Sequence, residues 1–174
     1  MLGSSLVVFA LAATGLAQVT APAGYRKVYI TSNVDKKFVV VGKSPVKAGS
    51  TLVVQTLTSK PEQQWWLQNG KTRVQLVDTT LCMDAGATKT AWKDMGPIAL
   101  QECSETADGQ KWEVKADGRI ALDLSPAPQQ CIDLQYMRAT QNNPVGLYTC
   151  AGLGNTGAAD KGINWPLVNV TTTP

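Results

Sequence analysis

Short apolar runs separated by polar turns dominate the chain after its first residues. Near the start these runs are Val28–Ile30, Phe38–Val41, Leu52–Val54 and Trp65–Leu67. β-Branched and aromatic residues in the runs, with Gly, Pro, Asn or Asp between them, are typical of strands. Outside residues 1–17 no stretch keeps the 3.6-residue period of a helix. The pattern therefore predicts an all-β chain.

The same pattern occurs three times. Trp65, Trp112 and Trp165 lie 47 and 53 residues apart, each two positions before an apolar residue. A basic residue that opens an apolar run recurs every 46 residues, at Lys27, Arg73 and Arg119. Three copies of four strands predict a closed β architecture with few exposed edges, in which the repeated Trp side chains fill a shared core. We expect the copies to span about residues 25–69, 70–116 and 117–169.

Four cysteines follow the same repeat. Cys82 and Cys131 lie 49 residues apart, and Cys103 and Cys150 lie 47 apart. Four cysteines allow three pairings, of which Cys82–Cys103 with Cys131–Cys150 respects the repeat. Each such loop closure contributes about 3 kcal/mol to stability. The first copy has no cysteine and must rely on packing.

Residues 1–17 predict a secretory signal peptide, because an apolar run is followed by small residues before a cleavage site after Ala17. The run is shorter than the ~20 residues that span a bilayer, and no later segment is long enough. The mature domain would cover residues 18–174. A glycosylation sequon at Asn169 agrees with export and with a eukaryotic source, for example a fungus. We expect a secreted, extracellular protein without a membrane span.

Charge and residue usage argue against several functions. The net charge of +3 is not clustered into the basic stripe that nucleic-acid binding needs. The chain has no histidine, which excludes Ser-His-Asp and Cys-His nucleophile systems and the commonest zinc and iron ligand sets. Glu102, Glu105 and Asp108 could serve a glycosidase but lie near a turn, where solvated charges are expected. We predict a protein that is not an enzyme and holds no cofactor or metal.

The repeat motifs resemble those of the ricin B-type lectin family over about residues 25–169. Gln63-Gln64-Trp65 and Gln110-Lys111-Trp112 match the QxW motif of that family, and Ile163-Asn164-Trp165 keeps only its Trp. Cys82-Met83-Asp84 and Cys131-Ile132-Asp133 look like its Cys-x-Asp segment. The resemblance implies a β-trefoil of three four-stranded repeats with pseudo-threefold symmetry that binds carbohydrate or glycoprotein glycans.

The resemblance also implies where a sugar would bind. In this family the Asp of Cys-x-Asp accepts hydrogen bonds from sugar hydroxyls, and an aromatic ring two residues before the second cysteine covers the apolar face of the sugar. A Gln on the third strand and polar residues beside the QxW assist. The third copy has Asp133 and Tyr148, but Gly146 replaces the Gln and Ile163 stands beside the Trp. Asn143 and its neighbour Asn142, on the adjoining loop, could supply the missing polar contacts.

The other copies depart further from the family pattern. The second keeps Asp84 and Gln110 but has Gln101 in place of the ring and Ala99 in place of the Gln. Trp92 either leans over this pocket as a substitute ring or packs against the protein itself. The first copy has neither the Asp nor the ring, so no site is expected there. The sequence predicts at most one or two weak sugar sites, with Asp133, Tyr148, Asn143, Asp84, Gln110 and Trp92 as candidate residues.

Two functions remain open at this point. The first is a secreted lectin. The second is a sugar-independent trefoil that acts on a protein target, such as a protease inhibitor or a secreted effector, because a fold need not keep its family's function. The long loops Ser44–Ser50 and Ala151–Gly162 would then form the contact surfaces.

Overall fold

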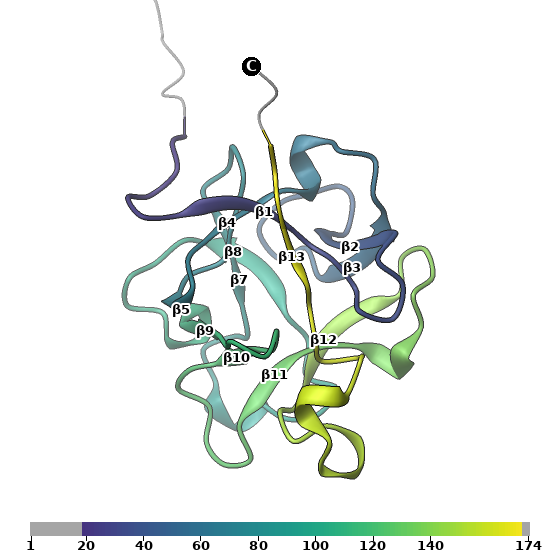
Figure 1. Cartoon of the computed structure of the whole chain (residues 1–174). Helices are drawn as coiled ribbons and strands as arrows, with labels where there is room; N and C mark the ends of the chain where they lie inside the picture. The colour runs from purple at the N-terminus through teal and green to yellow at the C-terminus, as the bar shows by residue number, and fades with distance from the viewer. Residues whose placement is uncertain (1–18, 172–174) are drawn as a thin grey trace, which may run out of the picture.

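The computed structural model describes residues 19–171, and the predicted signal peptide lies outside them. Strands make up its regular structure, joined by 3-10 turns of three residues each (Figure 1). The strands are β1 (Arg26–Ile30), β2 (Phe38–Gly42), β3 (Leu52–Thr56), β4 (Trp65–Leu67), β5 (Gly70–Thr72), β6 (Gln75–Leu76), β7 (Leu81–Asp84), β8 (Ala99–Glu102), β9 (Trp112–Val114), β10 (Ile120–Leu122), β11 (Gln130–Leu134), β12 (Pro144–Thr149) and β13 (Leu167–Asn169). The 3-10 turns are η1 (Pro61–Gln63), η2 (Lys89–Ala91), η3 (Asp108–Gln110), η4 (Gln135–Met137), η5 (Leu153–Asn155) and η6 (Gly157–Ala159). In this part of the chain no helix has the length and apolar character needed to cross a membrane.

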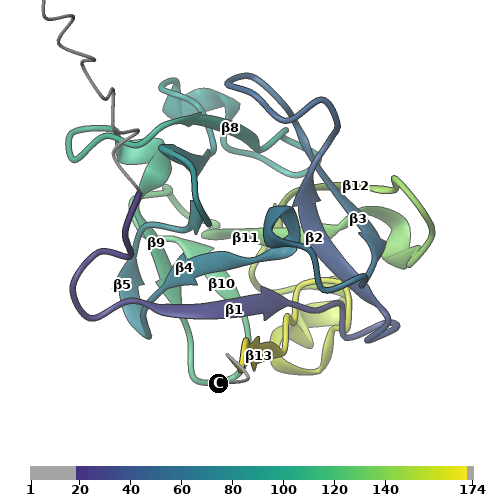
Figure 2. The same cartoon turned by 90° about the horizontal axis from the view of Figure 1, so that it is seen from above.

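The strands form a β-trefoil. The first and last strands of the repeats pair around a barrel: β1 with β4 and β13, β4 with β6, and β9 with β5 and β10. The two middle strands of each repeat pair with each other as β2–β3, β7–β8 and β11–β12. Figure 2 shows β1, β4, β5, β9 and β10 on one side of the molecule. The first strand of the second repeat is divided at Arg73–Val74 into β5 and β6, so thirteen strands stand where twelve were expected.

The repeated tryptophans form the centre of the core, as predicted. The side chains of Trp65, Trp112 and Trp165 are at most 1% exposed. Their indole N–H groups donate to the backbone carbonyls of Val40, Met83 and Ile132, at 2.9, 3.1 and 3.0 Å respectively. The three acceptors occupy the same position in β2, β7 and β11. Each Trp therefore supplies apolar volume and also fixes a hairpin to the barrel.

We expect Trp112→Phe to lower the free energy of unfolding by about 1–3 kcal/mol. The substitution keeps an aromatic ring but leaves the buried carbonyl of Met83 without its donor. Chemical denaturation of the variant and the wild type measures the difference. An unchanged unfolding free energy would show that the indole hydrogen bond contributes nothing to stability.

Both predicted disulfides are present. Cys82 pairs with Cys103, and Cys131 pairs with Cys150. The paired cysteines are separated by 21 and 19 positions in the sequence, respectively. In the second repeat the bridge links β7 to the residue that follows β8, and in the third it links β11 to the residue that follows β12. The third-repeat bridge therefore joins the two strands that carry Asp133 and Tyr148.

Candidate functional site

A cavity lies beside the hairpin of β11 and β12 in the third repeat. Strand pairing places Asp133 opposite Gly146 and Cys131 opposite Tyr148. Side chains of paired residues on antiparallel strands share a face of the sheet, so Asp133 and Tyr148 are on the same face. The cavity has a volume of about 410 Å³ and is lined by Met95, Asp133, Leu134, Tyr136, Met137, Tyr148, Leu153 and Asp160. The two residues predicted to form the third-copy site are thus brought together.

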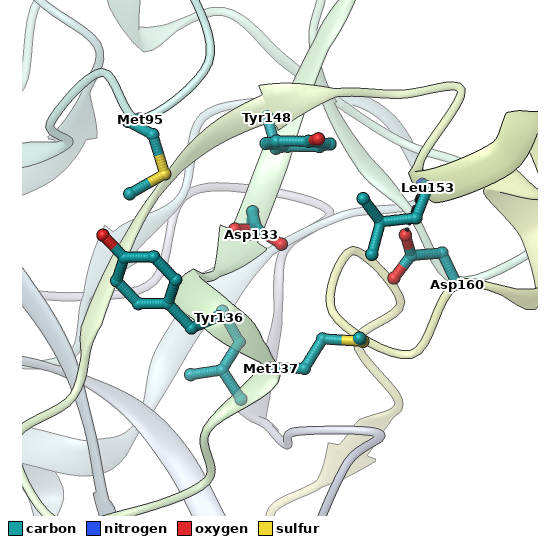
Figure 3. Close-up of a pocket in the computed structure, with 8 residues that line it drawn as sticks. Met95, Asp133, Tyr136, Met137, Tyr148, Leu153 and Asp160 are labelled. Carbon is teal, nitrogen blue, oxygen red and sulfur yellow. Dashed lines mark hydrogen bonds between the residues drawn. The ribbon is translucent and has the colours of Figure 1, made fainter.

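Figure 3 shows how these side chains surround the cavity. The carboxyl group of Asp133 lies in the middle, with the ring of Tyr148 above it, seen nearly edge-on. Met95 and Tyr136 lie on one side, and Leu153 and Asp160 lie on the other. The arrangement surrounds one carboxyl group with aromatic and aliphatic surface.

Asp133 is the unusual group in this cavity. Its residue is 7% exposed, and its carboxyl group makes no hydrogen bond or ion pair with any residue in the described range 19–171. Burial raises its pKa to about 7, with smaller contributions from the negative charges of Asp160 and Asp94. Buried polar groups normally have hydrogen-bond partners, so the carboxyl group of Asp133 is available to a ligand that donates.

Asp160 is a lining residue that the sequence interpretation missed. Its Oδ2 accepts from the backbone N–H of Leu153, and its Oδ1 accepts from that of Gly162, both at 2.8 Å. These bonds fold the loop 151–162 against the cavity and place Leu153 on its rim. The sequence signal that could have identified Asp160 is an Asp two residues before a Gly in a polar loop, which is a common turn arrangement.

One wall of the cavity comes from the second repeat. The backbone N–H of Met95 donates to the carbonyl of Leu147, and that of Leu147 donates to the carbonyl of Gly96, both at 2.8 Å. Pro97 forms a β-bridge with Gly146, where a Cβ atom would lie only 2.7 Å from the Gly96 oxygen. The segment carrying Met95 therefore occupies the space of the third-strand side chain. A Gln side chain at position 146 would meet this backbone, so the glycine fits the observed packing.

The turn after β11 supplies the other missed residues. Tyr136 and Met137 adopt left-handed backbone angles, with φ of 58° and 49°, and expose 70% and 43% of their surface. Asn143, predicted to contact the sugar, is not a lining residue. Its Nδ2 instead donates to the carbonyl of Gln135 at 2.9 Å and holds this turn. Neighbouring Asn142 bonds to Gln55 through its side-chain oxygen at 2.9 Å.

The two second-repeat candidates, Asp84 and Gln110, form hydrogen bonds with each other and with nearby backbone groups. Asp84 Oδ2 accepts from Gln110 Nε2 at 2.9 Å, and its Oδ1 accepts from the backbone N–H of Gly86 at 2.6 Å. Gln110 is 1% exposed, and its Oε1 accepts from the backbone N–H of Ser104 at 2.8 Å. A ligand would have to displace these bonds. The arrangement favours a structural role for this pair over sugar contact.

Trp92 packs against the protein and does not lean over the second-repeat pocket. The residue is 4% exposed and belongs to the main hydrophobic core, and its indole N–H donates to the carbonyl of Gly86 at 2.9 Å. The ammonium of Lys89 lies 5.7 Å from the ring centroid. A ring buried in this way offers no face to a sugar, so Trp92 packs against the protein. Its apolar bulk outweighs the polarity of its neighbours in sequence.

Asn169, the sequon residue, is exposed at the end of β13. Its Oδ1 accepts a hydrogen bond from a guanidinium nitrogen of Arg26 at 2.6 Å. Glycosylation at this position remains a prediction.

The barrel and the three capping hairpins define a β-trefoil protein, with the cavity of Asp133 and Tyr148 in its third repeat. The ricin-type β-trefoil lectin domain matches residues 72–160, and the chain belongs to this family. No curated protein matches the sequence.

Solved structures with the same fold include lectins. The C-terminal half of an earthworm R-type lectin in complex with GalNAc aligns with a TM-score of 0.60 and 17% identity, covering 83% of this chain and 99% of that one. The Rhizoctonia solani agglutinin aligns with a TM-score of 0.61 and 16% identity, covering 88% and 100%. The designed threefold-symmetric protein ThreeFoil aligns with a TM-score of 0.65 and 15% identity, covering 83% and 99%. These matches confirm the β-trefoil.

Proposed function

We propose that this protein is a secreted carbohydrate-binding protein with a single sugar site, the third-repeat cavity. The observation that carries the proposal is the buried carboxyl group of Asp133, which has no partner within residues 19–171 and faces a cavity beside the ring of Tyr148. A carboxylate accepts two sugar hydroxyls strongly, and an aromatic ring covers the C–H face of a pyranose. Secretion is supported by the two disulfides, which persist in oxidising compartments.

Affinity at this site should be weak. Few polar groups converge on the cavity, and the second repeat, whose polar groups bond to each other, adds no further site. A single site also lacks the avidity that several linked sites provide. Lectin neighbours such as the earthworm protein, solved with GalNAc, support sugar as the ligand class.

Binding without catalysis is the expected activity. Among residues 19–171, Asp160 is the one other carboxylate that lines the cavity, and both of its oxygens accept backbone N–H groups. Glycoside hydrolysis needs a second carboxyl group free to act as acid, base or nucleophile.

A glycan array followed by titration of the best glycan tests the proposal. We expect Tyr148→Ala to weaken binding about tenfold or more, because the sugar loses its aromatic platform, and Tyr148→Phe to retain most of the affinity. Gln101→Ala is the matched control, since Gln101 is exposed and holds the equivalent position in the second repeat. It should bind like the wild type.

Binding to a protein is the second candidate, favoured by the exposed apolar rim of the same cavity. Met95, Tyr136, Met137 and Leu153 are 42%, 70%, 43% and 54% exposed, respectively. An array on which the wild type binds no glycan would overturn the lectin proposal and favour this candidate. Glycan binding that neither Tyr148→Ala nor Asp133→Ala weakens would place the sugar elsewhere on the trefoil.

A further inference from the structure

The cavity offers hydrogen-bond acceptors and negative charge but no cation. Its polar groups are the carboxyl groups of Asp133 and Asp160 and the phenolic hydroxyls of Tyr136 and Tyr148. Of the described residues that line it, none is Lys, Arg, Asn or Gln. The two hydroxyls can donate as well as accept, but the lining residues bring no cationic side chain that could pair with an anionic substituent.

A third carboxylate adds to the negative charge. Asp94 precedes the lining residue Met95, and its Oδ1 accepts from the backbone N–H of Thr149 at 2.7 Å, next to Tyr148. Asp94 and Asp160 both disfavour ionisation of Asp133, whose pKa lies near 7 chiefly because the group is buried. The guanidinium of Arg138 lies 5.6 Å from the centroid of the Tyr136 ring, and Arg138 is not among the residues that line the cavity.

A neutral sugar would hydrogen-bond to Asp133 but leave this charge uncompensated. A protonated amine would both donate to the carboxylate and neutralise it, and such charge-assisted bonds are the stronger kind. Aromatic rings add attraction, because the face of a Tyr ring attracts a cation within about 6 Å of its centroid. The Tyr148 ring and two Met side chains lie around the buried acid, while the Tyr136 ring already has the Arg138 guanidinium beside it. A buried acid beside an aromatic ring and apolar side chains suits a ligand that has one ammonium group on an otherwise uncharged, partly apolar sugar ring.

We propose that the third-repeat pocket prefers an amino sugar, with its free ammonium group against Asp133, over the N-acetylated and hydroxyl forms of the same sugar. The inference rests on the sugar-binding function proposed above and specifies its ligand class. Carboxylated sugars should be the poorest ligands, because like charges repel at short range in a poorly solvated site.

Calorimetric titration with three matched sugars tests the preference. Galactosamine, N-acetylgalactosamine and galactose differ in one substituent, and glucosamine, N-acetylglucosamine and glucose repeat the comparison with the other configuration at C4. At pH 7 we expect the amine to bind about tenfold tighter than both counterparts in at least one series. Because the ammonium lowers the pKa of Asp133, binding should also release protons below about pH 7, which titrations in buffers of different ionisation enthalpy detect.

Asp94→Asn sharpens the test. An Asn side-chain oxygen can still accept from the Thr149 N–H, so the variant removes charge and keeps the contact. It should reduce the ratio of amine to N-acetyl affinity by about threefold. Asp78→Asn, in the exposed turn between β6 and β7, is the matched control and should leave that ratio unchanged.

The outcomes separate this inference from the proposed function. Equal or tighter binding of the N-acetylated or hydroxyl sugars in both series would overturn the amine preference and leave the lectin function standing. A ratio that Asp94→Asn does not change would overturn the electrostatic basis of the preference. No binding of any of the six sugars, together with an empty glycan array, would overturn both.

Discussion

Asp133→Asn is expected to weaken sugar binding about a hundredfold and, at pH 8, to raise the free energy of unfolding by up to about 4 kcal/mol. The loss of affinity follows from replacing an ionised acceptor of two hydroxyls with a neutral amide, since each hydrogen bond to a charged group contributes about 1.5–3 kcal/mol. The gain in stability follows from removing a carboxyl group that the fold keeps buried without a partner.

The sign of the pH dependence follows from the two pKa values of Asp133. In the unfolded chain the group titrates near 3.8, and in the folded protein burial raises its pKa to about 7. Between these values the folded state binds more protons, so this residue makes stability fall as pH rises from about 4 to 7 and then level off. At about 1.4 kcal/mol for each pH unit, the destabilisation of the wild type reaches about 4 kcal/mol above pH 7. The variant should therefore match the wild type near pH 4 and exceed its stability increasingly up to about pH 7.

Denaturant unfolding at half-unit steps from pH 4 to 8, with sugar titrations at the same pH values, checks both effects. Asp78→Asn should follow the wild-type pH profile. In the wild type, affinity for a neutral sugar should rise as pH increases through about 7, because the ionised acid is the better acceptor. A stability difference between Asp133→Asn and wild type that stays constant across this range would mean that Asp133 does not titrate near 7.

Removing the third-repeat disulfide is expected to affect stability and binding together. Replacing both Cys131 and Cys150 with Ser should lower the free energy of unfolding by about 3 kcal/mol. It should also weaken sugar binding severalfold. Cys131 stands two residues before Asp133, and Cys150 two residues after Tyr148, so the bridge fixes the distance between the strands that carry both groups.

The second-repeat disulfide provides the control. Replacing Cys82 and Cys103 with Ser opens a loop of similar length and should cost a similar free energy of unfolding. It should leave sugar affinity unchanged under conditions where the protein stays folded. Equal loss of affinity in the two double variants would show that the bridges act on binding only through global stability.

The fold was predictable because its signals are periodic. Trp65, Trp112 and Trp165 are buried large side chains, and a closed threefold barrel needs the same volume filled at the same place in each repeat. The cysteine spacing selected the observed pairing for the same reason, since equivalent positions on equivalent hairpins lie equally close. Asp133 and Tyr148 were predicted together from the family resemblance, and the pairing of β11 with β12 brings them to one face of the hairpin.

The candidate contacts outside that periodic frame were predicted less well. Asn143 and Gln110 carry amides suited to sugar hydroxyls, but backbone and side-chain partners in the folded protein take up their hydrogen bonds. Trp92 lies in a polar stretch yet is buried in the core. Whether a polar side chain is free for a ligand depends on which backbone groups come near it, and residues distant in sequence decide that.

Spacing along the chain was enough to predict the threefold repeat and its two disulfides, and the resemblance to ricin B-type lectins added the β-trefoil and the acid–ring pair of the third copy. The surroundings of that pair depend on how the chain folds. Met95 reaches the cavity from another repeat because Gly146 leaves room for the backbone of the next residue, Gly96. Asp160 lies on a loop held by the hydrogen bonds of its own carboxylate. These contacts join segments far apart in sequence, and they give the pocket its apolar walls and its negative charge.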